Sequence, residues 1–417
     1  MKPVPIIVLL CSFSNDKLRK HLHFSMFYWG NIIRRLLRMP FDTDFAVWDT
    51  YAIAELEKLN EFEIHVVAPH SGVARLQEFK ENGIYYHIFW SEWDIIIEKI
   101  KRRFNLRTEK AFPRNRKTIS RLIRKIQPDI VHVIGIENKF HSMAVLDIPT
   151  SIPVIAQLQT LISDKRFKDN CRSTEKAYQY DSQIEQIILN RADFIGTDVK
   201  CFRKIIVDNI KPNAIFLDMA LPLTEKIRKE ETNKLYDFVY FAADISKAAD
   251  WAIEAFALTN KKHPEVKLNI VGGYSKDYKN EIDKRIAELN LASNISFEGK
   301  LPTHEDVIAQ IRKSRFAILP LKIDLISGTV REAMANGIPV VTTETPATPK
   351  LNERFQSVLI APNGDFQAMS ELMCELIENP SFAAKISENG LNISAARKSN
   401  EEIIAGWVRS YFEILDQ

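Results

Sequence analysis

The chain has 417 residues, which is enough for two domains with large buried cores. Hydrophobic residues make up 46% and charged residues 27%, as is typical of a soluble globular protein. No run of 18 apolar residues is present, so the sequence predicts no transmembrane helix. The four cysteines are scattered without metal-ligand spacing, which fits a reducing cytoplasm.

The formal net charge of +3 conceals an asymmetry along the chain. Residues 1–220 carry 33 Lys and Arg against 26 Asp and Glu, whereas the remainder carries 24 against 28. The N-terminal half is therefore basic and the C-terminal half is acidic. A basic half indicates an anionic partner on that side of the protein.

The N-terminal half alternates short apolar runs with amphipathic segments. Ile6–Leu10 predicts a first strand rather than a signal peptide, since prolines precede it and no small-residue cleavage site follows. A long helix is expected from about residue 16, and a second helix over 73–82. Further strands are expected at Ile64–Ala68, Tyr85–Phe89, Ile130–Val133, Ile152–Leu158 and Phe216–Leu217. This βαβ alternation indicates a doubly wound α/β sheet.

The most basic part of the chain spans residues 99–125, where twelve Lys and Arg are interleaved with apolar side chains. A nucleic-acid interface would need a recognisable motif, and the segment contains none, so no nucleic-acid partner is expected. Two interpretations stay open. The segment is either a solvated helical face or a patch for anionic lipid headgroups, which attract such clusters by about 1 kcal/mol per basic residue.

The C-terminal half repeats the alternation after a charged linker at Pro222–Asn233. Strands are expected at Asp237–Ala242, Lys267–Val271, Ile295–Phe297, Phe316–Leu319, Pro339–Thr342 and Ser357–Ile360. Thr303–Asp306 is a capping signature for the helix that follows it. Glu401–Leu415 predicts an amphipathic final helix.

One stretch, Ile318–Thr343, reads as strand, loop, helix, turn and strand. Ser327, Gly328 and Thr329 open a short helix predicted over Val330–Asn336. A small-residue loop at a helix N-terminus is an anion site, because free backbone N–H groups and the helix dipole both favour negative charge. Two carboxylates, Asp324 and Glu332, flank the loop and suit sugar or ribose hydroxyls. Taken alone, the stretch also fits an ordinary βα crossover.

The wider pattern favours the anion site. An acidic residue, Asp324, is followed after seven residues by Glu-Ala-Met-Ala-Asn-Gly-Ile-Pro-Val-Val at Glu332–Val341. This pattern resembles the signature of the family 4 (group 1) retaining glycosyltransferases of the GT-B fold. The resemblance implies two Rossmann-like doubly wound domains facing across a cleft. Residues 1–222 would form the acceptor-side domain, 223–400 the nucleotide-sugar domain, and 401–417 a terminal helix that crosses back to the first domain.

The same resemblance assigns roles to individual residues. Glu332 would bind the ribose hydroxyls and Asp324 the donor sugar hydroxyls, while Lys247 would bind the diphosphate. The backbone N–H groups of Ser327, Gly328 and Thr329 would also hold the diphosphate. The remaining donor-binding positions are Gly272, Gly273, Glu298, Gln159, Ser12 and Ser14. The chain departs from the family pattern at Gln159, where a His is usual, and at Asp244, where an Arg is usual. Ser12 and Ser14 stand where the family has a glycine-rich loop.

The function implied is transfer of a sugar from a nucleotide diphosphate donor, with retention, to a glycan or lipid-linked acceptor in bacterial surface polysaccharide synthesis. No cofactor is expected, and no metal either, since the Asp-x-Asp motif of metal-dependent transferases is absent. The expected location is the cytoplasm, at the inner face of the cell membrane, with residues 99–125 toward anionic lipid. Two other classes stay open: a sugar-nucleotide epimerase of the same fold, and a catalytically silent nucleotide-binding member.

Overall fold

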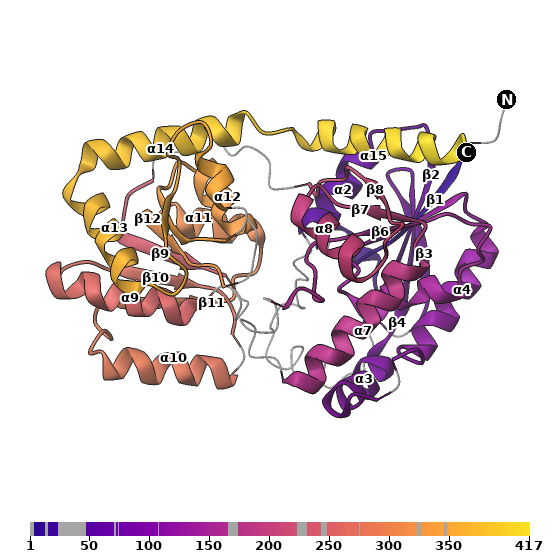
Figure 1. Ribbon diagram of the computed structural model, residues 1–417, viewed down its shortest axis with the longest axis horizontal. Helices are drawn as coiled ribbons and strands as arrows, with labels where there is room; N and C mark the ends of the chain where they lie inside the picture. The colour runs from indigo at the N-terminus through magenta and orange to yellow at the C-terminus, as the bar shows by residue number, and fades with distance from the viewer. Residues whose placement is uncertain are drawn as a thin grey trace. The chain divides into compact units, whose positions relative to one another are not determined.

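The chain folds into two compact units in the computed structural model (Figure 1). The first unit contains Met1–Leu223 together with Lys398–Gln417, and the second contains Thr224–Arg397. The structure describes residues 4–12, 16–23, 47–70, 72–73, 75–106, 108–165, 174–222, 232–242, 248–274, 276–322, 327–345 and 348–417.

The first unit is built on an eight-stranded sheet in the order β3-β4-β2-β1-β5-β6-β7-β8, parallel except for β3. Its strands are β1 (Ile6–Leu10), β2 (Glu63–His70), β3 (Gln77–Glu81), β4 (Ile84–Trp90), β5 (Ile130–Ile134), β6 (Val154–Gln157), β7 (Phe194–Gly196) and β8 (Ile215–Leu217). Its helices are η1 (Asp16–His21), α2 (Val47–Leu56), α3 (Glu92–Phe104), α4 (Pro113–Ile126), α5 (Lys139–Ser142), η2 (Met143–Asp147), α7 (Glu175–Arg191), α8 (Lys200–Asn209) and α15 (Asn400–Leu415).

The expectation of a helix over residues 73–82 is wrong. Gln77–Glu81 is strand β3, which pairs antiparallel with β4 so that Glu81 lies opposite Ile84. The two residues between them, Asn82 and Gly83, both have positive φ angles, 48° and 84°. Asn-Gly is the dipeptide that a two-residue hairpin turn prefers, and it reverses the chain before a helix can form. Of the long helix expected from residue 16, the structure describes only the 3-10 turn η1, and residues 24–46 lie outside the described part.

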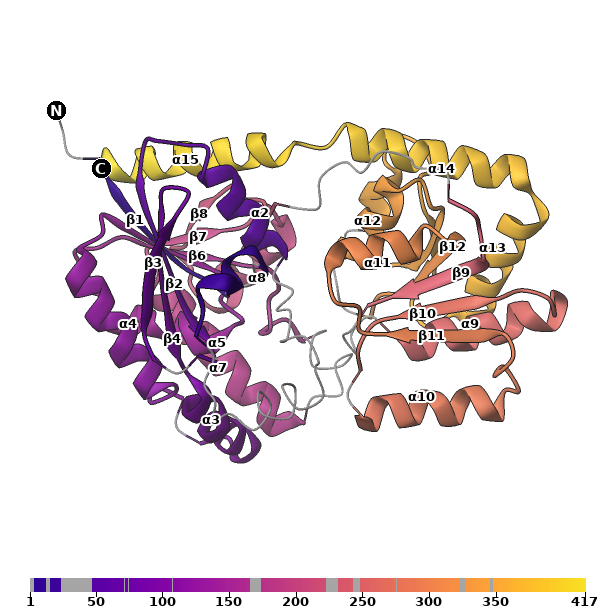
Figure 2. The same cartoon turned by 180° about the vertical axis from the view of Figure 1, so that it is seen from behind.

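The final helix α15 packs on the first unit, beside α2 in both views (Figures 1 and 2). Its apolar face enters the same core cluster as β1 and α2. Trp407 is fully buried, and its indole N–H donates to the Ala220 carbonyl at 2.9 Å. The Tyr411 hydroxyl lies 2.7 Å from Nδ1 of His132, whose pKa is lowered to about 3 by burial. His132 is therefore a neutral packing residue at neutral pH.

The second unit carries a six-stranded parallel sheet in the order β11-β10-β9-β12-β13-β14. Its strands are β9 (Tyr236–Phe241), β10 (Leu268–Val271), β11 (Ile295–Gly299), β12 (Ser314–Leu319), β13 (Val340–Thr343) and β14 (Leu359–Ala361). Its helices are α9 (Ala249–Lys262), α10 (Lys276–Glu288), α11 (His304–Ile311), α12 (Gly328–Ala335), η4 (Thr348–Asn352), α13 (Phe366–Glu378) and α14 (Pro380–Ala395).

Helices cover both faces of this second sheet, as a parallel sheet requires. Along β9, Phe238 and Tyr240 pack into the cluster that contains α9 and α13, whereas Val239 and Phe241 pack with α11 and α12. Figure 1 shows α9 and α10 on the opposite side of the strands from α11 and α12. None of the helices that the structure describes is long and apolar enough to cross a membrane.

The docking of α15 on the first unit predicts that Trp407→Ala lowers the free energy of unfolding of that unit by about 3–5 kcal/mol, the usual cost of truncating a buried Trp. Urea denaturation measures this cost. Phe412→Ala on the same helix is the matched control, because Phe412 is 41% exposed and should cost much less. Equal losses in the two variants would contradict a core role for Trp407.

Candidate functional site

The predicted anion site of the second unit lies where the strand order reverses, between β9 and β12. Ligands of open α/β sheets bind at such a switch point, beyond the carboxyl ends of the strands. Helix α12 follows β12 and begins at Gly328, two residues before the predicted start. Ser327 caps it, with its Oγ accepting from the Thr329 N–H at 3.3 Å. A methyl group built on Gly328 would meet no described atom within 4 Å, so none of the described residues covers the backbone there.

The Ser327 cap changes the role expected for the Thr329 N–H, namely binding of the diphosphate. The Thr329 N–H is already taken by Ser327, and the Thr329 hydroxyl lies 2.8 Å from the same Ser327 Oγ. Gly328 and Val330 are also in the first turn, where backbone N–H groups have no partner inside the helix. These two N–H groups are better placed to bind an anion than that of Thr329.

The loop that connects β12 to α12 is fixed at its start by side chains from neighbouring elements. The Thr343 hydroxyl, at the end of β13, accepts from the Leu321 N–H and donates to the Leu321 carbonyl, both at 2.8 Å. Lys322 is only 8% exposed and binds both carboxylate oxygens of Asp250 in the first turn of α9, at 2.9 and 3.1 Å. The chain leaving β12 is thus held to β13 and to α9. Sequence analysis did not identify Lys322.

Glu332 has a partner that the sequence did not reveal. His304, the first residue of α11, places Nε2 3.3 Å from Oε1 of Glu332, and the two side chains are 20% and 15% exposed. Burial acts to lower the pKa of His304, but the hydrogen bond and charge of Glu332, with the charge of Glu305, outweigh it and raise the pKa above its ordinary value. The predicted capping box is present, with Thr303 and Asp306 exchanging hydrogen bonds. Sequence reasoning recognised that cap but not the contact of the intervening histidine.

The other predicted donor residues of this unit lie at the ends of β10 and β11. The Gly272 N–H donates to the Gly299 carbonyl at 2.9 Å. A Cβ on Gly273 would come within 2.9 Å of Cβ of Lys300, so glycine is needed there for close packing. Glu298 is exposed and its Oε1 accepts from the Gln310 amide at 2.8 Å. Asp324, Lys247 and Ser14, like Asp244, lie outside the described residues.

In the first unit, Ser12 and Gln159 lie with three residues that sequence analysis did not identify as site residues. Ser12 follows β1, Glu137 follows β5 and Gln159 follows β6, so these three residues lie at the carboxyl edge of the sheet. The other two residues come from α2. The Ser12 N–H donates to Oδ2 of Asp49 in α2 at 3.1 Å. With the Gln159 amide oriented to satisfy both of its neighbours, its nitrogen donates to Oε1 of Glu137 at 2.5 Å and its oxygen accepts from the Trp48 indole N–H.

Two of these carboxyl groups have pKa values raised above their usual range. Burial raises the pKa of Glu137 to about 8, and the charge of Glu185 adds to the shift. Burial also raises the pKa of Asp49 well above its usual range, and the charge of Glu137 contributes. Gly135 allows the Gln159 side chain to approach the backbone that precedes Glu137. Its φ is +72°, and a Cβ at this position would meet the Gln159 amide at 2.6 Å. A neutral carboxyl group can donate a hydrogen bond as well as accept one.

Comparison with known proteins connects the second unit to one family. Residues 224–392 match the family model described as Glycosyl transferases group 1. No curated protein matches the sequence significantly.

Solved structures with similar folds cover most or nearly all of the chain. Sucrose-phosphate synthase from Thermosynechococcus elongatus superimposes with a TM-score of 0.69 at 14% identity, covering 99% of each chain. Anabaena Alr3699/HepE in complex with UDP and glucose gives 0.66 at 13% identity, covering 97% of this chain and 99% of that one. The pneumococcal O-GlcNAc transferase GtfA in complex with UDP and GlcNAc gives 0.57 at 13% identity, over 72% of this chain and 60% of that one. These likenesses confirm the predicted two-domain α/β GT-B fold.

The contact between His304 and Glu332 predicts that Glu332→Gln lowers the pKa of His304, because burial is then opposed only by the smaller effect of the Glu305 charge. Histidine NMR titration measures it, with the His263 resonance as internal control. The pair stabilises the protonated imidazole. Its contribution to stability should thus be complete below the unfolded-state pKa, about 6.5, and lost as the pH rises through the folded-state pKa. An unchanged His304 titration in the variant would show that the two side chains do not interact.

Proposed function

We propose that this protein is a retaining glycosyltransferase of the hexosyltransferase type, which moves a sugar from a nucleotide diphosphate donor to a glycan or lipid-linked acceptor. The observation that carries the proposal is the capped N-terminus of α12 at the switch point of the second sheet, with Glu332 in the same helix. The group 1 match over residues 224–392 supports it. So do the UDP and the sugars in the structures of similar fold. Bacterial surface polysaccharide synthesis in the cytoplasm is the setting we propose.

In this proposal the second unit binds the donor. Glu332 accepts hydrogen bonds from the ribose hydroxyls, with one oxygen held by His304. The free N–H groups of the first turn of α12, with Lys247, bind the diphosphate, and Asp324 orients the sugar hydroxyls. The same N–H groups stabilise the charge that develops on the leaving phosphate.

Transfer with retention needs no protein nucleophile here. As the sugar–phosphate bond breaks, the leaving phosphate oxygen gains charge and takes the proton of the acceptor hydroxyl that attacks the same face. The first unit supplies the acceptor side of this chemistry. Glu137, whose pKa burial raises to about 8, suits the hydroxyl groups of a sugar, because a neutral carboxyl group both donates and accepts hydrogen bonds without repelling a phosphate.

We also propose that residues 99–125 contact an anionic membrane at the periphery. Ile100, Phe104 and Leu106 are more than half exposed, at 56%, 57% and 51%. Arg102 and Arg103 in the last turn of α3 are exposed beside them. Exposed apolar side chains next to basic ones are what an interfacial segment presents to a lipid surface.

Substitution of Glu332 tests the donor site. Glu332→Gln should lower the affinity for the nucleoside diphosphate at least about tenfold, since it removes charge-assisted hydrogen bonds to ribose, and it should lower transfer in parallel. Thermal-shift titration with UDP, GDP and ADP measures binding, because a ligand of the folded state raises its Tm. Exposed Glu353→Gln is the control. Wild-type binding by the Glu332 variant would reject the site.

Substitution of Asp324 separates sugar handling from nucleotide binding. Asp324→Ala should lower kcat for transfer at least about tenfold while changing nucleotide affinity less than about threefold, because the residue contacts the sugar rather than the nucleotide. Kinetics with and without an acceptor also distinguish a transferase from the epimerase alternative. An epimerase would form product from the donor alone. Equal loss of affinity and turnover would show that Asp324 has another role.

A further inference from the structure

A hollow on the first unit lies among the basic residues of α3, α4 and the turn that joins them. It has a volume of about 1050 Å³. Its basic lining consists of Lys101, Lys110, Arg116, Lys117 and Arg124, and its acidic lining consists of Glu109 and Asp147. The hollow lies within one unit and outside the carboxyl edge where Ser12, Glu137 and Gln159 gather.

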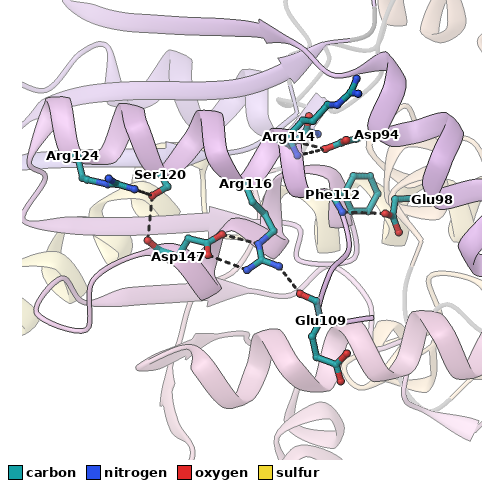
Figure 3. Close-up of polar contacts among 10 residues, drawn as sticks. Asp94, Glu98, Glu109, Phe112, Arg114, Arg116, Ser120, Arg124 and Asp147 are labelled. Atoms are coloured by element: carbon teal, nitrogen blue, oxygen red, sulfur yellow. Dashed lines mark hydrogen bonds and ion pairs between the residues drawn. The ribbon is translucent and has the colours of Figure 1, made fainter. Parts of the chain in front are cut away.

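Some of these charges are already neutralised within the protein. Arg116 binds both carboxylate oxygens of Asp147, at 2.7 and 3.0 Å, and donates to the Glu109 carbonyl (Figure 3). Lys101 is paired with Glu98 at 2.5 Å. In Figure 3 the carboxylate of Glu109 points away from Arg116.

Three cations have no acidic partner among the described residues. The ammonium groups of Lys110 and Lys117 make no hydrogen bond or ion pair with any described side chain, and both residues are exposed; the Lys110 carbonyl accepts from the Lys101 ammonium at 2.9 Å. Arg124 donates only to the Ser120 hydroxyl, at 2.9 Å (Figure 3). Like charges gathered around one concave surface repel each other, and an anion bound between them relieves that repulsion.

The walls of the hollow are fixed before any ligand arrives. Asp94 in α3 caps α4 by accepting from the Arg114 and Asn115 N–H groups at 2.9 and 2.8 Å. Glu98 accepts from the Phe112 N–H at 3.2 Å, which ties the connecting turn to α3. The Arg116–Asp147 pair joins α4 to the end of η2. A preformed arrangement of cations loses less entropy when it binds an anion.

We propose that this hollow is a binding site for a phosphate-bearing anion, held by Lys110, Lys117 and Arg124. Lysines and arginines on a concave surface are the residues that bind phosphate oxygens. The inference is independent of the donor site on the second unit. It gives a defined location to the anionic contact proposed for residues 99–125.

Either a lipid headgroup or a soluble phosphate compound supplies this chemistry. Leu106 lines the hollow and is half exposed. Lys101 lies on the same helical face as Ile97 and Phe104, because residues three, four and seven apart share a face. A phosphate in the hollow therefore sits beside an exposed apolar strip that an acyl or prenyl chain would cover.

The test uses the full-length protein with two probes, inorganic pyrophosphate by calorimetry and phosphatidylcholine vesicles with and without phosphatidylglycerol by co-sedimentation. The variant Lys117→Gln/Arg124→Gln removes two cations from the hollow. The control Lys200→Gln/Lys204→Gln removes two exposed cations from α8 and so changes net charge equally. All four side chains are exposed, so both variants should fold, and their Tm values verify this.

The proposal expects at least one probe to bind the wild type, and the hollow variant to bind it at least about tenfold more weakly, while the control stays within about threefold. Pyrophosphate binding that weakens in the hollow variant but not in the control identifies a soluble phosphate ligand of the hollow. Pyrophosphate binding that is unchanged in the hollow variant takes place elsewhere, for example at the proposed diphosphate site of the second unit, and counts as no binding to the hollow. Vesicle binding that requires phosphatidylglycerol, without pyrophosphate binding, identifies a lipid headgroup. Binding of neither probe, or equal weakening in the two variants, overturns the site. Vesicle binding that survives in the hollow variant also overturns it, while leaving the proposed membrane contact intact.

Discussion

The proposed donor site depends on the hydrogen bonds that fix the chain where it leaves β12. The Thr343 hydroxyl binds both the N–H and the carbonyl of Leu321, and Lys322 is locked to Asp250. These contacts set the direction in which the chain leaves the sheet, and Ser327 then starts α12 at the switch point. Separating the Lys322–Asp250 pair is costly mainly for Lys322, whose side chain is only 8% exposed and whose charge would lose this partner. The position of the helix N-terminus is therefore a property of the fold rather than of the loop alone.

Much of this arrangement could be predicted from sequence, because it is encoded locally. The strands of the second unit are short apolar runs between turns, and each expected strand lies within two residues of an observed one. The capping box at Thr303 and the opening of α12 at Ser327–Gly328 are signatures of adjacent residues. The expectation of a helix over residues 73–82 overlooked a local signal, Asn82-Gly83, which in the structure forms the hairpin turn between β3 and β4.

The parts that could not be predicted are contacts between distant elements. His304 reaches Glu332 from a different helix, and Glu137 comes near Gln159 and Asp49 only because the carboxyl ends of β5 and β6 lie beside the first turn of α2. No spacing in the chain encodes such meetings, and their consequences for protonation follow from burial. Gln159 illustrates this point: alone it is only an uncharged substitute for a histidine, whereas in the fold it hydrogen-bonds a carboxyl group that is itself neutral near pH 7. The basic segment likewise becomes a hollow only when α3 and α4 pack together.

The most direct measurement of the central claim is a crystal structure of the protein with a bound nucleoside diphosphate. The proposed donor site requires the diphosphate at the first turn of α12, within hydrogen-bond distance of the Gly328 N–H, and the ribose hydroxyls on the Glu332 carboxylate. A nucleotide bound elsewhere on the second unit, or at the carboxyl edge of the first sheet beside Glu137, would contradict it.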